Sequence, residues 1–322
     1  MTARADCAGG SVVTQGHQLF ADELAVLAAQ NADPRLSQIA AAITAPLQIA
    51  VTGRRGVGRR TMVAALAAAG IPSGIDVHSA ELSVHVVAEA RKPEDSAALR
   101  AARSRPVLVV LNKTDLLGRD GVAASKAAAE PMSALFALAG LGGGLDDRLW
   151  QALRCLAARP ADLSSAERFV SGVHPVPQQI RQRLCDTVDV SGIAALLDLA
   201  RREGTLAQAR ARLVALSGVE GVLARLQVMG AAAYHRRMTH ALTRLEAMAV
   251  ADSRIDAFLV RDATVAARLG AAVAAMGLPE EPPLERARRW QAYRSAPVGP
   301  AARSCATDIV RGSLRAWAAA RS

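Results

Sequence analysis

The sequence predicts an α/β domain with a mostly parallel sheet, followed by an α-helical domain. Two short apolar runs, residues 47–51 and 107–111, are predicted to be buried strands, and each enters a loop of glycine or polar residues. After Pro160 the strand signals stop, and apolar residues recur at spacings of three and four, as in α-helices. We therefore predict a helical segment over 1–44, an α/β domain over 45–159 and an α-helical domain over 160–322.

The first predicted strand leads into a glycine-rich loop and then into a helix. The loop is Thr-Gly-Arg-Arg-Gly-Val-Gly-Arg-Arg-Thr at residues 52–61, and helix-favouring residues follow at 62–67. Gly53 and Gly58 have the four-residue gap of the motif G-x-x-x-x-G-K-[ST]. In such a loop, backbone N–H groups surround phosphate oxygens at the N-terminus of a helix. The pattern predicts a phosphate-binding loop.

Two positions of this loop depart from the motif. Arg59 stands at the lysine position, and Arg60 stands at the Ser/Thr position that binds Mg²⁺, with Thr61 one residue later. Arginine is a permanently charged planar fork, so it holds phosphate with a different geometry from lysine. Mg²⁺ stays open as a cofactor, although a guanidinium at position 60 cannot be its ligand.

The second predicted strand ends in Asn112-Lys113-Thr114-Asp115, which has the form of the guanine-reading motif Asn-Lys-x-Asp. A carboxylate at Asp115 can accept two hydrogen bonds, from the N1–H and the 2-amino group of guanine, and adenine cannot offer this pair. Lys113 is expected to pack along the base, and Asn112 to tie this loop to the phosphate loop. The chain has only two Asn and three Lys, which makes a chance match improbable.

A third segment, Pro-Met-Ser-Ala-Leu at residues 131–135, has the form of a Ser-Ala-x loop. With this segment, residues 47–158 resemble a GTPase domain of the translation-factor-related class, which includes Era-like and dynamin-like GTPases. The resemblance implies a backbone N–H contact from the Ser-Ala-x loop to guanine O6, and GTP or GDP as ligand. It places the nucleotide-binding residues at Gly53, Gly56, Gly58, Arg59 and Thr61 in the phosphate loop, at Asn112, Lys113 and Asp115, and at Ser133 and Ala134.

The parts of that family that sense Mg²⁺ and the γ-phosphate are shortened or absent. Only about fifty residues separate Thr61 from Asn112, and we find no Asp-x-x-Gly between them. Residues 74–78 are a candidate remnant strand end, 82–87 the next strand and 96–103 a helix. Phosphoryl transfer depends on metal, switch contacts and a positioned water, so weak or no intrinsic GTP hydrolysis is expected, and no catalytic residue is assigned.

Apolar periodicity predicts helices before and after the α/β domain. Residues 205–226 loosely resemble the helical part of bacterial dynamin-like proteins, although any Ala/Leu-rich bundle would give a similar pattern. In a dynamin-like assembly this part would relay a signal or bury a partner surface. The predicted helices are 17–30, 34–43, 146–158, 164–170, 177–187, 191–202, 205–216, 217–248 and 255–276, with terminal helices at 284–293 and 306–321.

The composition limits the partners. The net charge is +10, which suits an anionic membrane surface or nucleic acid, but aromatic residues are only 3% and no nucleic-acid motif accompanies the arginines. Peripheral contact with anionic lipid therefore stays open, and nucleic acid is disfavoured. The four Cys and six His show no metal-ligand or redox spacing, and no metal site is predicted. No apolar run reaches membrane-spanning length and no signal peptide is evident, so a cytoplasmic protein is expected.

Two functions lead at the level of sequence, beside a third class, a basic peripheral protein on anionic lipid or RNA. The first is a guanine-nucleotide-binding protein, a dynamin-like or regulatory GTPase-related module that acts with a protein partner or a related GTPase. The second is a pseudo-GTPase, a scaffold that keeps the fold and binds no nucleotide. Arg59 and Arg60 favour the second, whereas the intact Asn112–Asp115 motif favours the first.

Overall fold

The computed structural model of the protein describes residues 15–75, 79–89, 91–102, 105–117 and 129–321. The chain divides into two compact units. One unit is Leu47–Leu226, and the other combines Met1–Pro46 with Gln227–Ser322. This grouping differs from the domains predicted from the sequence, because residues 160–226 belong with the sheet and the N-terminal helices belong with the C-terminal ones.

The first unit contains a five-stranded sheet in the order β2-β1-β3-β4-β5. All four strand pairs are parallel, which confirms the predicted α/β class and parallel sheet. In the register, Thr52 of β1 pairs with His85 of β3, and His85 pairs with Val109 of β4. The strands are β1 (Ile49–Gly53), β2 (Ser73–Ile75), β3 (Leu82–Ala88), β4 (Val107–Asn112) and β5 (Glu130–Pro131).

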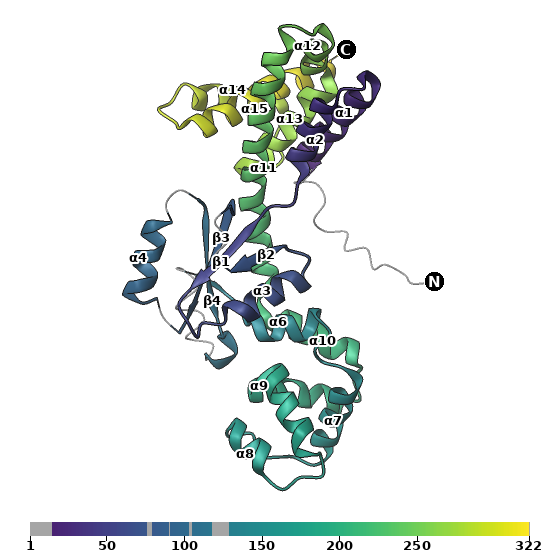
Figure 1. The fold of residues 1–322 in the computed structure, drawn as a ribbon, viewed down its shortest axis with the longest axis vertical. Coiled ribbons are helices and arrows are strands. Elements are labelled where there is room, and N and C mark those ends of the chain that lie inside the picture. Colours follow the sequence, from purple (N-terminus) through teal and green to yellow (C-terminus); the bar gives the residue numbers. More distant parts are fainter. Residues whose placement is uncertain (1–14, 76–78, 90, 103–104, 118–128, 322) are drawn as a thin grey trace. The chain divides into compact units, whose positions relative to one another are not determined.

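Helices flank this sheet as crossover connections require (Figure 1). The chain passes from β1 to β2 in one direction along the sheet through α3 (Arg59–Ala68), and from β3 to β4 in the opposite direction through α4 (Pro93–Ala101). Right-handed crossovers therefore place α3 and α4 on opposite faces. The helix predicted over 96–103 begins earlier, because Pro93 occupies its first turn and Asp95 accepts a hydrogen bond from the Lys92 N–H.

A helical layer in the same unit follows β5. Its apolar core joins α6 (Ala134–Leu141) to the later helices, with Phe136, Leu153 and Leu184 among its buried residues. The two predicted helices 177–187 and 191–202 are both present within α9 (Gln178–Arg201) and are separated by a kink at Asp189, where φ is 54°. The remaining helices of this layer are α7 (Asp147–Ala158), α8 (Ala166–Ser171) and α10 (Leu206–Ser217), and a 3₁₀ turn, η1 (Thr114–Leu116), follows β4.

The second unit is entirely helical within the described residues. Phe20, Phe258 and Leu245 lie in an apolar core that joins its N-terminal and C-terminal helices, and Trp290 and Ile309 lie in a second cluster. The predicted helices 17–30 and 34–43 are confirmed as α1 (Gln15–Asn31) and α2 (Pro34–Thr44). The others are the later part of α11 (Val219–Ala249), α12 (Ser253–Val260), α13 (Asp262–Met276), α14 (Pro283–Arg294) and α15 (Pro300–Ala319).

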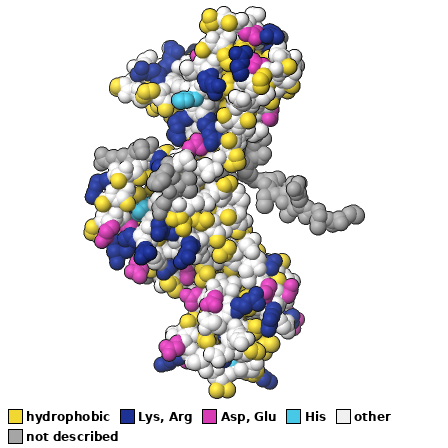
Figure 2. Space-filling view, in the orientation of Figure 1, with side chains coloured by type: hydrophobic (Ala, Val, Ile, Leu, Met, Phe, Trp, Pro, Cys, Tyr) yellow, Lys and Arg dark blue, Asp and Glu magenta, His cyan; other side chains and the backbone are white. Residues whose placement is uncertain are grey.

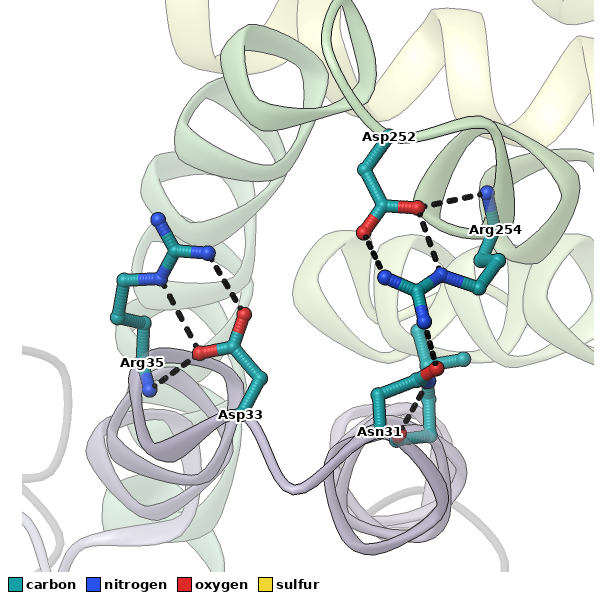
Figure 3. Close-up of polar contacts among 6 residues, drawn as sticks. Asn31, Asp33, Arg35, Asp252 and Arg254 are labelled. Atoms are coloured by element: carbon teal, nitrogen blue, oxygen red, sulfur yellow. Dashed lines mark hydrogen bonds and ion pairs between the residues drawn. The ribbon is translucent and has the colours of Figure 1, made fainter.

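Two helices of this unit begin with the same Asp-x-Arg cap (Figure 3). Asp33 accepts hydrogen bonds from the backbone N–H and the guanidinium of Arg35, and Asp252 does the same with Arg254. The Arg254 guanidinium also donates to Asn31 Oδ1 at 2.7 Å, which joins the start of α12 to the end of α1. These caps satisfy helix N–H groups that would otherwise lack acceptors.

No single helix in the described parts of the chain is long and apolar enough to cross a membrane, although α10 and α11, bent by 59°, meet the length and composition limits as a pair. On the face shown in Figure 2, the basic side chains lie over both units and are interspersed with acidic ones.

Candidate functional site

The predicted phosphate loop lies where β1 ends and α3 begins. Gly53 and Gly58 both have positive φ, 134° and 91°. A Cβ at Gly53 would lie 2.4 Å from the Val86 carbonyl oxygen, and a Cβ at Gly58 would lie 2.4 Å from the Asn112 side-chain nitrogen. Only glycine combines this backbone conformation with such close approach. The loop geometry therefore requires glycine at both motif positions.

The N-terminus of α3 is open for an acceptor. Gly58 is its N-cap and supplies no side-chain hydrogen bond. Among the described residues, the N–H groups of Gly56 and Gly58 have no acceptor. Arg59 and Thr61 are half-buried in the first turn of α3, and Arg60 is exposed. Unpaired N–H groups and the helix dipole make such a terminus suitable for an anion.

Asn112 connects the predicted motifs. It lies at the end of β4 and is 3% exposed. Its side-chain nitrogen donates to the Val57 carbonyl oxygen at 2.8 Å, and its side-chain oxygen accepts from the Ala134 N–H at 2.9 Å. The predicted tie between Asn112 and the phosphate loop is thus present. One buried amide holds the loop after β1 and the loop after β5 against the end of β4.

The two charged residues of the base-reading motif follow Asn112. Lys113 is exposed and has φ of 63°, in the left-handed region, and Asp115 is half-buried in η1. Among the described residues, the Asp115 carboxylate makes no hydrogen bond or ion pair, and no hydrogen bond joins Lys113 or Thr61 side chains to the other predicted site residues. The carboxylate can therefore accept donors from a ligand without losing a contact to any described residue.

In the Ser-Ala-x loop, the first two residues already use their backbone N–H groups within the protein. The N–H of Ser133 donates to the Ser217 carbonyl oxygen at 2.8 Å, and the N–H of Ala134 is used by Asn112. The Ser133 hydroxyl caps α6 by accepting from the Phe136 N–H. In the described structure, the first backbone N–H of this loop without an acceptor is that of Leu135. A contact to a ligand oxygen from this loop is thus better placed at Leu135 than at Ala134.

A buried polar network that the motifs do not predict lies under the phosphate loop. The Thr52 hydroxyl is 3.0 Å from His85 Nδ1, and His85 Nε2 is 3.3 Å from Asp95 Oδ1. Arg54 Nε donates to both Asp95 carboxylate oxygens at 3.2 Å. Burial by itself raises the pKa of Asp95, but hydrogen bonds from Lys92, Arg54 and His85 bring it below its usual value. The sequence signal that could have revealed this network was the presence of polar residues inside the otherwise apolar strands 49–53 and 82–88.

This network borders a cavity of about 520 Å³ between α4 and the sheet. Ser83, on the neighbouring strand β3, is also polar and is 3% exposed. Parallel sheets are normally covered by apolar side chains on both faces, so hydroxyl and imidazole groups here are unusual. The lining includes Thr52, Arg54, Ser83, His85, Asp95 and Val107.

Among the described residues, the site has N–H donors for an anion and an unpaired carboxylate, but no metal-binding set. No group of three or more His, Cys, Asp or Glu side chains in the described parts of the chain is arranged to hold a metal ion. Arg60, at the usual Mg²⁺-ligand position, has no oxygen to offer. Residues 76–78 of the predicted strand remnant lie outside the described residues, and β2 before them spans Ser73–Ile75.

The shared edge of the sheet is what brings these groups together. The carboxyl ends of β1, β3 and β4 lie side by side. After β1 the chain adds β2 on one side of it, and it then crosses back to add β3 on the other side, so the direction of the connections reverses at β1. In open α/β sheets, ligands bind at such a switch point.

No known protein-family model matches the chain, and no curated protein matches it.

Proposed function

We propose that the protein binds guanine nucleotides at the carboxyl edge of its sheet. The observation that carries the proposal is the Asn112 side chain, which joins the phosphate loop at Val57 to the Ser-Ala-x loop at Ala134. Three motifs separated by up to about eighty residues in the chain thereby meet around one buried amide. A chance glycine turn and an unrelated polar turn would have no reason to share this contact.

Each part of the nucleotide has a matching group. The uncapped N-terminus of α3 and the glycine loop offer N–H groups for phosphate oxygens. Asp115 offers a half-buried carboxylate without a protein partner among the described residues, which suits the N1–H and 2-amino donors of guanine. The Leu135 N–H is available for guanine O6.

Hydrolysis is expected to be slow or to depend on a partner. Arg60 replaces the hydroxyl that would hold Mg²⁺, and no Asp-x-x-Gly follows the phosphate loop. Under saturating GTP and Mg²⁺, a phosphate-release assay should therefore give turnover below that of ordinary small GTPases. Turnover of about 4 × 10⁻⁴ s⁻¹ or faster by the isolated chain would contradict this expectation.

The proposal is tested by titrating the purified protein with fluorescent GDP and GTP, using ADP as competitor. We expect binding that excess ADP does not displace, and an affinity at least about 100-fold weaker in Asp115→Ala, because the variant loses two charge-assisted hydrogen bonds. Asp147→Ala, an exposed carboxylate in α7, is the matched control and should bind as the parent does. Equal affinity for ADP, or an unaffected Asp115→Ala, would refute guanine recognition.

A pseudo-GTPase is the second candidate, and one observation favours it. The N–H groups of Ser133 and Ala134 both donate within the protein, so these two residues of the Ser-Ala-x loop need no ligand. In that case neither GDP nor GTP would bind with or without Mg²⁺, and the fold would serve a partner instead.

A further inference from the structure

Arg54 is a loop arginine that the phosphate-loop motif does not specify. It lies one residue after Gly53, and its side chain is 28% exposed. Its Nε donates to both oxygens of Asp95, while its two terminal nitrogens have no acceptor among the described residues. Arg54 also lines the cavity beside α4, so these terminal N–H groups are reachable from solvent. The guanidinium is therefore held at Nε by Asp95, while its two terminal nitrogens have no acceptor among the described residues.

Asp95 is itself fixed from three directions. It is fully buried, accepts from the Lys92 N–H at 2.9 Å, and faces His85 Nε2 at 3.3 Å. His85 in turn contacts the Thr52 hydroxyl, two residues before Arg54. The chain of contacts therefore starts and ends on the β1 strand and its loop. Such closed support fixes a side chain better than an isolated surface ion pair does.

We propose that Arg54 is a further phosphate-binding residue and that Asp95 is its positioning residue. This inference rests on the proposed nucleotide site and deepens it. The ligand group is a phosphate of the bound nucleotide, approached by the terminal nitrogens of Arg54 from the α4 side of the loop. Planar guanidinium N–H groups match phosphate oxygens in pairs. Arg54 supplies anion recognition beside Arg59, at a loop whose motif lysine is missing.

The first test compares GDP with guanosine, which has the same base and ribose but no phosphate. Arg54→Ala should weaken GDP binding about tenfold and leave guanosine binding unchanged, because the lost contact is a charged hydrogen bond to phosphate. Arg55→Ala removes the same charge from an exposed neighbour and is the matched control, with a loss of about twofold or less expected. Equal losses in the two variants, or none in Arg54→Ala, would overturn the role of Arg54.

The second test separates positioning from folding. Asp95→Asn should weaken GDP binding about threefold to tenfold in the parent and have no further effect in the Arg54→Ala background. A merely structural Asp95 would lower affinity by the same factor in both backgrounds, and unchanged or tighter binding in the single variant would also contradict positioning. Thermal unfolding of each variant shows whether it is folded, and Asp95→Glu, which keeps the carboxylate, should restore part of the affinity.

Guanine recognition by Asp115 and phosphate binding by Arg54 can fail separately. If GDP binding is lost in Asp115→Ala and unaffected in Arg54→Ala, guanine recognition stands and the Arg54 inference is wrong. If the parent protein binds no GDP, both are wrong.

Discussion

At the scale of residues, Asn112 organises the candidate site. The rarity of Asn in this chain and its place after an apolar run made the residue predictable from sequence. Gly53 and Gly58 were predictable as well, because their spacing is that of a phosphate-loop motif with a defined backbone conformation. Sequence reasoning could not give the Ala134 N–H as a donor to Asn112, or the partners of Arg54, since these depend on which strands become neighbours in the sheet.

Gly58 provides a residue-scale prediction with a matched control in the same loop. Gly58→Ala should destabilise the sheet unit by about 2–4 kcal/mol, because strain at φ 91° adds to a clash with the Asn112 amide. Gly56→Ala has a similar φ, 86°, but no atom within 4 Å of the new Cβ, so about 1–2 kcal/mol is expected.

Urea unfolding followed by Trp150 fluorescence, with Trp290 and Trp317 changed to Phe, measures both variants in the sheet unit. Equal destabilisation by the two substitutions would show that the close approach of Gly58 to Asn112 contributes nothing.

At the scale of elements, the turn between α10 and α11 packs against the loop that follows β5. Ser217 accepts the Ser133 N–H, and a Cβ at Gly218 would lie 2.5 Å from the Pro131 carbonyl oxygen. Arg225, in the second turn of α11, pairs with Glu130 at 3.6 Å. Periodicity predicted helices at 205–216 and 217–248, and both are confirmed, but it carries no information on what they contact.

Helices α11, α13 and α15 meet at a buried polar cluster in the helical unit. His235 Nδ1 is 3.4 Å from Cys305 Sγ, and His235 Nε2 is 3.6 Å from Asp308 Oδ2. Asp308 also accepts two hydrogen bonds from Arg268, at 2.9 and 2.6 Å. Burial by itself lowers the pKa of His235, but the Asp308 carboxylate and the Cys305 thiol raise it to about 9.

This cluster predicts a loss of stability in alkaline solution. The folded-state pKa of His235 lies above the unfolded value of 6.5, so folding favours the imidazolium. Its contribution, on the order of 3 kcal/mol, is fully present below about pH 6.5 and is lost as the pH rises through about 9.

The free energy of unfolding of the helical unit, followed by Trp290 and Trp317 in a Trp150→Phe background, should therefore fall between pH 6.5 and 9.5. His235→Gln should remove most of this slope, and His240→Gln, an exposed residue of the same helix, should keep it. A slope unchanged by His235→Gln would show that other groups titrate.

At the scale of the whole molecule, the contact grouping differs from the domain boundaries predicted along the chain. The strand signals stop after Pro160, which suggested a boundary there. The structure instead groups contacts by packing: α10 lies against α6 and α9 against α7 in one core, while α1 packs with α13 in the other. A unit built from both ends of a chain has no local signature, because its core forms between residues more than two hundred positions apart.

Exchanging the hydrogen-bonding pattern of Asp115 tests most directly whether this residue reads guanine. Asp115→Asn replaces one acceptor with a donor, which suits the 2-oxo group of xanthine and opposes the 2-amino group of guanine. Calorimetric titration with GDP and xanthosine diphosphate should show that the parent prefers GDP and that the variant prefers xanthosine diphosphate. If the two proteins have the same preference, or if the parent binds neither nucleotide, Asp115 does not read a base and the account is wrong.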